Sequence, residues 1–493
     1  MLVPVLVLTL TAITPSSDGG SAWPSVGAPD AGPASSEVTI GSADTGLPST
    51  EPVEAGRLSD ALLNAAAVDG GLFTSGAANG TPPDEGFGVD AGSASERVEA
   101  EALPLRVERV ELQGLSWTKP FVALRELQLD LPGTVTPTEW SLGLTRLWNC
   151  GLFSRVDGRL ERRPEGVVAV VELEERFSLN PLFSFGIGGG AAWVRLGLND
   201  TNFLGRFLEW GLRYERFLAF NGGQVWFRDP RLFGKRLTGL AQVEWLFRPR
   251  PEYTRRRLQG LVDVLGELDD LFLFGLRLEA FQDEYSAPLV GEPRLPQNLR
   301  GVLIHPSLRM GRIDTVRLRE RGASLEVRTS IGVTTDATSP LYAQSLVEGL
   351  GFIMLGERFN LALRGQLGLS TAAPTEQRFY LGGLDLIRGF DDSSVRTEQF
   401  LLGNAELRAV VFDSTWFAVV PAAFVDGAVV RTESLETKGL LSAGLGVRLL
   451  VPKMLRTGLR ADVAITLVGG RPQVGFAFGV FQFFSSTDRF AIR

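Results

Sequence analysis

Residues able to do chemistry are scarce in this chain, which has one histidine, His305, and one cysteine, Cys150. A zinc centre built from His and Cys needs several such ligands, and a Cys/His catalytic pair would have to consist of these two residues. His305 precedes Pro306, and a lone histidine before proline is more often a loop or turn residue than a catalytic base. No Gly-x-Ser-x-Gly elbow supplies a serine nucleophile. We therefore expect no enzyme activity, no catalytic residue, no metal and no cofactor.

Composition limits the class of protein further. The 493 residues are 44% hydrophobic, and no run of eighteen or more apolar residues follows the first dozen. Membrane-spanning helices are therefore not predicted, and any membrane span must consist of strands. The formal net charge is −8. With no concentrated basic patch, this charge argues against a nucleic-acid partner.

The first hundred residues predict export followed by a linker. Residues 1–22 contain an apolar run followed by small residues, which is typical of a signal peptide. No Lys or Arg precedes Arg57, so either the start codon is misplaced or the signal is atypical. Residues 23–104 are rich in Pro, Gly, Ala and Ser and cannot bury enough apolar surface to offset the entropy of ordering. We expect a disordered linker there.

Residues 105–176 predict a small α+β domain. LRVERVELQGL alternates apolar and polar residues like a strand, whereas KPFVALRELQLDLPG and TPTEWSLGLTRLWNCGLF have helical apolar spacing. Thr136, Pro137 and Glu139 form a sequence typical of a capping box with proline in the first turn. SRVDGRLERR and GVVAVVELEER then alternate again. The predicted order is β-α-α-β-β.

Residues 177–484 consist of short two-residue alternations separated by turn residues, typical of many strands. In 206–216 the apolar positions are Leu208, Trp210, Leu212 and Tyr214. A soluble β-sandwich would alternate too. Three features favour a transmembrane antiparallel barrel: segments of roughly ten residues, charges on the inferred inner face, and aromatics such as Trp245 suited to interface girdles. We expect a mainly β fold with an even strand number near sixteen.

The domain at 105–176 resembles a POTRA (polypeptide-transport-associated) domain. The resemblance rests on Gly114 after the first strand, Gly151-Leu152-Phe153 after the second helix, and the last strand ending at Glu174-Glu175-Arg176. A generic α+β domain is the alternative. In that family the sheet offers an exposed edge to client strands or partner proteins, which add a strand to it. The resemblance implies a periplasmic partner at this domain.

Residues 379–390, FYLGGLDLIRGF, carry a second resemblance, to the BamA/TamA-type bacterial surface-antigen family of outer-membrane assembly factors. NAEL at 404–407 and FVDG at 424–427 follow in the family's order. In that family the Arg-Gly-Phe tip belongs to a long extracellular loop that folds back inside the barrel. The loop motif consists of Gly382, Gly383, Arg388, Gly389 and Phe390.

The same resemblance assigns Glu406 and Asp426 as the carboxylate partners of Arg388. A guanidinium in a barrel lumen cannot deprotonate, so it needs such partners. The segment 475–484 resembles the closing strand, whose aromatics, here Phe476, Phe478 and Phe484, serve the family as an insertion signal. Residues 485–493 form a C-terminal extension beyond the point where family barrels usually stop.

The resemblance covers about residues 105–484. It implies a bacterial outer-membrane barrel with its small domain in the periplasm, surrounded by outer-membrane lipids and inserting or exporting unfolded client proteins. The main assembly factors of the family carry several POTRA domains, whereas one is found here, which favours a specialised or accessory relative. The alternatives are a passive channel or plugged barrel without clients and, least favoured, a barrel lipase that uses His305. Client protein levels after depletion distinguish the first two.

Overall fold

The computed structural model describes residues 97–98, 105–164, 166–269, 271–289, 294–316, 318–335, 340–383, 386–414, 416–431, 436–450, 458–468 and 471–480. The predicted signal peptide at 1–22, nearly all of the predicted linker at 23–104, Phe484 and the extension at 485–493 lie outside these residues. Within them, no helix combines the length and apolarity that crossing a bilayer would take.

The first compact part is a five-stranded sheet with two helices. Its elements are β1 (Arg97–Val98), β2 (Leu105–Gln113), α2 (Pro120–Leu127), β3 (Gly133–Val135), α3 (Pro137–Asn149), β4 (Phe153–Arg163) and β5 (Gly166–Glu175). The strand order is β1-β4-β5-β2-β3, with β2 parallel to β5. Two strands were not predicted: β3 lies between the helices, and β1 comes from the segment expected to be linker. Both are three residues or fewer, too short to show a period of two.

The helices form as their sequences predict. Thr136 accepts a hydrogen bond from the Glu139 amide, the Glu139 side chain accepts one from the Thr136 amide, and Pro137 begins α3, so the predicted capping box is confirmed. The buried sides of α2 and α3 pack on the sheet around Val107, Leu147 and Phe153, which are fully buried. The domain therefore has a hydrophobic core of its own.

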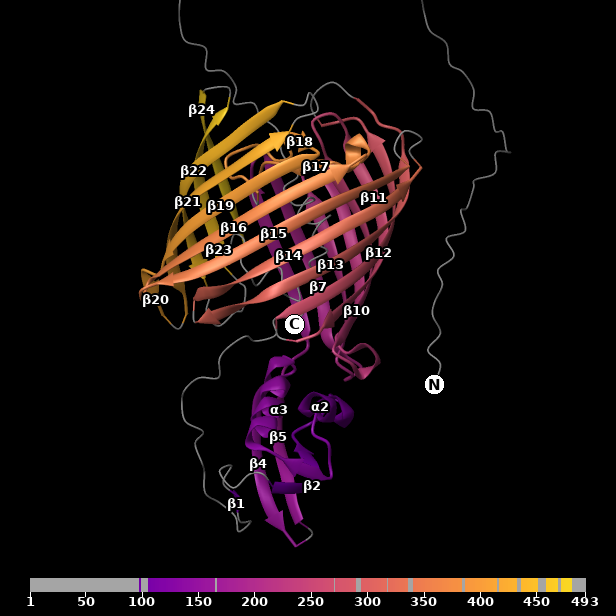
Figure 1. Ribbon diagram of the computed structural model, residues 1–493, viewed down its shortest axis with the longest axis vertical. Helices are drawn as coiled ribbons and strands as arrows, with labels where there is room; N and C mark the ends of the chain where they lie inside the picture. Colours follow the sequence, from indigo (N-terminus) through magenta and orange to yellow (C-terminus); the bar gives the residue numbers. More distant parts are fainter. Residues whose placement is uncertain are drawn as a thin grey trace, which may run out of the picture. The chain divides into compact units, whose positions relative to one another are not determined.

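The second part is a closed antiparallel barrel (Figure 1). Its sixteen long strands are β6 (Leu179–Gly188), β7 (Ala191–Phe203), β8 (Leu208–Phe217), β9 (Phe220–Asp229), β10 (Leu237–Pro249), β11 (Thr254–Glu267), β12 (Phe272–Ser286), β13 (Leu299–Val316), β14 (Arg319–Thr334), β15 (Leu341–Leu355), β16 (Phe359–Thr371), β19 (Gln399–Ala409), β21 (Ala418–Arg431), β22 (Thr437–Leu450), β23 (Gly458–Val468) and β24 (Arg471–Val480). Shorter elements are η2 (Leu232–Gly234), η3 (Thr375–Gln377), β17 (Phe379–Leu381), β18 (Val395–Thr397) and β20 (Phe412–Asp413). The predicted fold class is confirmed.

The strands alternate between an apolar outer face and an inner face that carries the buried charged residues. On β23, Val463 and Ile465 are exposed on the outside, whereas Arg460 and Asp462 are buried inside. Successive side chains of a strand point to opposite faces, so this alternation gives lipid an apolar surface and leaves the charges in the interior. The predicted girdle residue Trp245 is exposed on the outer face and contacts Phe247.

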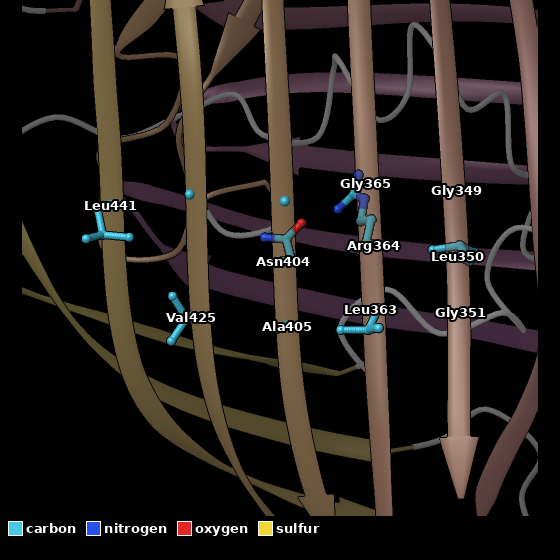
Figure 2. Close-up of a pocket in the computed structure, with 12 residues that line it drawn as sticks. Gly349, Leu350, Gly351, Leu363, Arg364, Gly365, Asn404, Ala405, Val425 and Leu441 are labelled. Atoms are coloured by element: carbon cyan, nitrogen blue, oxygen red, sulfur yellow. The ribbon is translucent and has the colours of Figure 1, made fainter.

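Four glycines lie side by side on the outer face of the barrel, at a groove (Figure 2). They are successive register partners across β15, β16, β19 and β21, namely Gly349, Gly365, Gly403 and Gly427. A Cβ added at Gly365 or Gly403 would meet no other atom within 4 Å. The missing side chains leave a groove of about 560 Å³ bordered by Leu363, Val425 and Leu441. This groove lies on the outside of the strands that carry Glu406 and Asp426 on their inner faces.

Candidate functional site: an ion cluster that anchors a loop inside the barrel

The inner loop connects β16 to β19, and its described residues, 372–383 and 386–398, lie within the barrel. Its strands β17 and β18 pair with each other. Figure 1 labels both of them near one end of the barrel. Leu381, Ile387 and Phe390 are buried and pack with inward side chains of β15, β19 and β21. About 25 cal/mol is gained per Å² of apolar surface removed from water, so this packing favours the docked loop. The barrel interior is therefore partly filled by its own chain.

Glycines give the loop its path. Gly382 and Gly383 have φ of 117° and 86°, and Gly389 has φ of 86°, a region that favours glycine. A Cβ at Gly382 would lie 2.2 Å from the Asp391 carbonyl oxygen. The glycines predicted as part of the motif thus allow a close backbone turn that brings Arg388 to the barrel wall.

Arg388 lies at the centre of the site with its side chain fully buried. Its Nε and Nη2 donate to the two carboxylate oxygens of Asp426, each at 2.8 Å, and its Nη1 donates to Glu406 at 2.6 Å. Its backbone amide also donates to Asp426 at 3.1 Å, and its guanidinium lies 3.4 Å from the centroid of the Phe424 ring. The fork geometry uses both oxygens of one carboxylate, which lysine could not do.

The residues around this contact form a balanced network. Glu406 also accepts from Arg408 at 2.7 Å and from Arg448 at 3.0 Å, and Arg448 donates to Asp462 at 2.6 Å. The ion cluster has four arginines and four carboxylates, all buried: Arg388, Arg408, Arg448, Arg460, Glu320, Glu406, Asp426 and Asp462. Equal numbers of opposite charges offset the cost of desolvating each one.

Sequence reasoning found three members of this cluster and missed five. Arg388, Glu406 and Asp426 came from the family motif, and the structure brings them together. Arg460 and Asp462 alternate with apolar residues on β23, so strand periodicity places them inside the barrel. Which inward residues meet the loop depends on the register between strands, and a single sequence does not reveal that register.

The barrel closes where β24 pairs with β6, and the described part of this seam is short. The register joins Ala477 to Gly188, Phe478 to Ile187, and Gly479 to Gly186. β6 ends at Gly188, so residues 471–476 of β24 extend past it and pair only with β23. An overhanging strand end leaves backbone N–H and C=O groups without a ladder on one side.

The inner loop contacts both sides of this seam. The Asp392 amide donates to the Gly189 carbonyl oxygen, in the hairpin between β6 and β7, at 2.8 Å. On the other side Gly475 of β24 approaches the loop so closely that an added Cβ would lie 2.5 Å from the Gly389 Cα. The loop anchored by Arg388 therefore spans the junction of the first and last strands.

The aromatic residues predicted for the closing strand lie on the lipid side where they are described. Phe476 and Phe478 are exposed on the outer face of β24, and Phe478 contacts Phe185 of β6 at 5.5 Å between centroids. Phe484 lies outside the described residues.

His305 is not in a loop or turn, which corrects the expectation from its proline neighbour. It lies within β13. His305 and Pro306 pair with β12, whereas the register with β14 skips both residues. This gap accommodates a residue that has no N–H to donate. His305 Nδ1 lies 2.7 Å from Ser330 Oγ, and its Nε2 lies 3.3 Å from Glu279. In serine hydrolases Nε2 faces the serine and Nδ1 the carboxylate, so this order is reversed.

The fold and the ion cluster define a class: an outer-membrane antiparallel barrel of sixteen long strands with a loop anchored inside. Residues 307–484 match the Omp85 superfamily domain. No curated protein is similar enough in sequence to match it.

Solved structures share the fold at low sequence identity. The chain is similar to BamA from Haemophilus ducreyi lacking POTRA domains 1–3, with a TM-score of 0.60 and 16% identity over 76% of this chain and 84% of that one. It is also similar to CdiB from Acinetobacter baumannii (TM-score 0.57, 13% identity, 76% and 73% covered). CdiB from Escherichia coli gives a TM-score of 0.56 and 14% identity, with 76% of both chains covered.

The match to the Omp85 superfamily domain distinguishes a barrel for protein insertion or secretion from an enzyme. An Omp85 barrel is an outer-membrane protein for insertion or secretion of proteins and not an enzyme. The lipase alternative that relied on His305 is set aside on this ground.

Proposed function

We propose that this protein inserts or exports unfolded client proteins, and that the client strand is templated at the seam between β24 and β6. The observation that carries the proposal is the step in the seam, where residues 471–476 of β24 have no partner on the β6 side among the described residues. An extended client segment can satisfy these free backbone groups by adding a strand. The reaction needs no catalytic residue because the work is done by backbone pairing.

The inner loop is proposed to hold the seam in its closed form until a client arrives. Its contacts with Gly189 on one side and Gly475 on the other support this role. Arg388 fixes the loop to β19 and β21, which lie on the same side of the seam as β24 in the strand order. Weakening Arg388 should therefore loosen the seam as well as the loop.

The small domain is proposed to act as a POTRA domain in the periplasm. β1 pairs with only Leu160 and Glu161 of β4, so in the described part of the chain the edge of β4 from Phe153 to Arg159 has no neighbour on that side. Free edges of this kind accept a strand from another protein. This supports a periplasmic partner or an incoming client segment as the ligand of the domain.

The alternative is a passive barrel in which the loop is only a plug. The buried loop supports both functions, since it occupies the interior in either case. The seam distinguishes them because only an insertion or export barrel needs it to open.

A disulfide lock across the seam tests the proposal. In a Cys150→Ser background, Ile187→Cys with Phe478→Cys places two cysteines opposite each other, both on the outer face. The matched control is Val225→Cys with Val243→Cys, an opposing outer-face pair between β9 and β10. Each protein is reconstituted in liposomes, and insertion of a small urea-unfolded outer-membrane barrel is followed.

The oxidised seam lock should abolish the acceleration of client insertion, and reduction should restore it, while the control lock should have no effect. Equal acceleration by the locked and unlocked proteins would refute templating at the seam.

A further inference from the structure

Away from the seam and the ion cluster, the barrel contains a second charged chamber. A cavity of about 60 Å³ lies between the inner faces of β11 to β15 and the loop segment 376–379. One water needs roughly 10–15 Å³ of such space, so several waters or one small ion fit. Five arginines line the cavity, namely Arg250, Arg255, Arg257, Arg328 and Arg378.

Most of these arginines are engaged by protein groups. Arg257 forms a bidentate contact with Asp283, in which its Nε and Nη2 each donate to one carboxylate oxygen at 2.7 Å. Arg328 pairs with Glu326 at 2.6 Å, and Arg378 pairs with Glu398 at 2.9 Å. Arg250 donates to Ser393 Oγ in the loop at 2.6 Å and stacks on the Tyr380 ring at 3.6 Å from its centroid.

Arg255 differs from them. It is 4% exposed, and no residue in the described part of the chain accepts a hydrogen bond from its Nε or forms an ion pair with it. Its charged neighbours are Arg257, Asp283 and Arg250, and Asp283 is already held by Arg257. The two carboxylates that line the cavity, Glu279 and Glu376, do not pair with it; Glu279 lies 3.6 Å from Arg257 and 3.3 Å from His305.

A buried arginine that has no ion-pair partner favours the binding of an anion. A guanidinium stays charged in proteins, and an unpaired buried charge is strongly destabilising. The guanidinium fork matches the oxygen pairs of carboxylates and phosphates. We propose that the cavity binds one small oxyanion, such as free phosphate or a small carboxylate, through Arg255, and that the bound ion stabilises the folded barrel.

The test uses the full-length protein in non-ionic detergent. Binding of radiolabelled inorganic phosphate is measured by equilibrium dialysis, and thermal unfolding is followed by gel migration without boiling. Phosphate replaces chloride at constant ionic strength, and acetate and glucose 1-phosphate form parallel series. The variants are Arg255→Gln and the matched Arg256→Gln, which changes the next residue on the same strand, where the side chain is half exposed on the outer face.

We expect wild type and Arg256→Gln to bind one phosphate and to show a saturable rise in unfolding temperature. Arg255→Gln should lose both, and without oxyanion it should be at least as stable as wild type because it lacks the unpaired charge. Acetate shows whether carboxylates share the site, and the bulkier glucose phosphate should not bind. If Arg255→Gln does not fold, Arg255→Lys, which keeps the charge but lacks the fork, should bind more weakly.

Absence of phosphate and acetate binding in the wild type would overturn the proposal. Equal binding by wild type and the Arg255 variant would overturn it as well.

Discussion

At Arg388 the size of a mutational effect depends on burial. Removing one member of a desolvated ion pair typically costs about 3–5 kcal/mol, whereas an exposed pair contributes about 0–1 kcal/mol. Arg388→Ala should therefore lower the free energy of unfolding by several kcal/mol, and Arg388→Lys should be only partly tolerated because lysine lacks the fork. Urea unfolding in detergent, followed by gel migration without boiling, measures both.

The control for Arg388 is Arg256→Ala, since Arg256 pairs with Glu284 at 2.9 Å while remaining half exposed. It should change stability little. A charge exchange between Arg388 and Asp426 should rescue part of the loss. Wild-type stability and loop protease resistance in Arg388→Ala would mean that the buried contact does not anchor the loop.

Residue motifs predicted the centre of the ion cluster but not its surroundings. The spacing of RGF, NAEL and FVDG identified Arg388, Glu406 and Asp426, because these residues lie within recognisable segments. Arg448 and Glu320 lie on β22 and β14, and only the closed barrel brings them to the same place. Arg255 carries no motif at all, since its lack of a partner in the described part of the chain is a property of the folded interior.

At the scale of elements, the end of β5 is tied to the segment before α2. Glu175 accepts hydrogen bonds from the amides of Ser116, Trp117 and Thr118 at 3.0, 2.9 and 2.6 Å. Burial raises the pKa of the Glu175 carboxyl, but the hydrogen bonds from Ser116, Thr118 and Trp117 outweigh it and lower the pKa to about 2. The ionised carboxylate therefore stabilises the folded domain.

This shift predicts acid sensitivity of the domain. The stabilisation is fully present above the ordinary pKa of 4.5 and is lost as the pH falls toward 2. Burial raises the pKa of the Cys150 thiol to about 12 and keeps it unreactive in the folded domain. In the full-length protein, Cys150 should become reactive to dipyridyl disulfide, which reacts in acid, across this pH range.

The matched variants are Glu175→Gln and Glu174→Gln, since Glu174 is the exposed neighbour on β5. Glu175→Gln should make Cys150 more reactive at neutral pH and flatten the pH dependence, while Glu174→Gln should behave as wild type. The same pH profile in all three proteins would show that Glu175 does not stabilise the domain.

Element types were predictable where the sequence period was long enough. The alternation in β8 and β23 and the capping box of α3 gave strands and a helix directly. β1 and β3 could not be predicted, because strands of two or three residues depend on the edges of β4 and β2 for their pairing. His305 was predicted in a loop or turn but lies in a strand. β13 tolerates Pro306 because its pairing with β14 is interrupted at this position.

At the scale of the whole molecule, the inner loop contacts both sides of the seam between β24 and β6. The sixteen-stranded barrel follows from period and length, since bilayer-crossing strands need roughly ten residues each. The step in the seam depends on where β6 ends at Gly188 and could not be read from alternation alone.

The central claim is that this barrel inserts or exports other proteins, and quantitative proteomics after gene deletion tests it most directly. Outer-membrane and released proteins would be compared in the wild type, in the deletion strain, and in strains complemented with wild type or with the oxidised seam-locked variant that carries Ile187→Cys and Phe478→Cys. We predict that a defined set of β-barrel or secreted proteins falls on deletion and returns with wild type but not with the locked protein. Unchanged levels of all other outer-membrane and released proteins in the deletion strain would contradict the claim and favour a plugged, passive barrel.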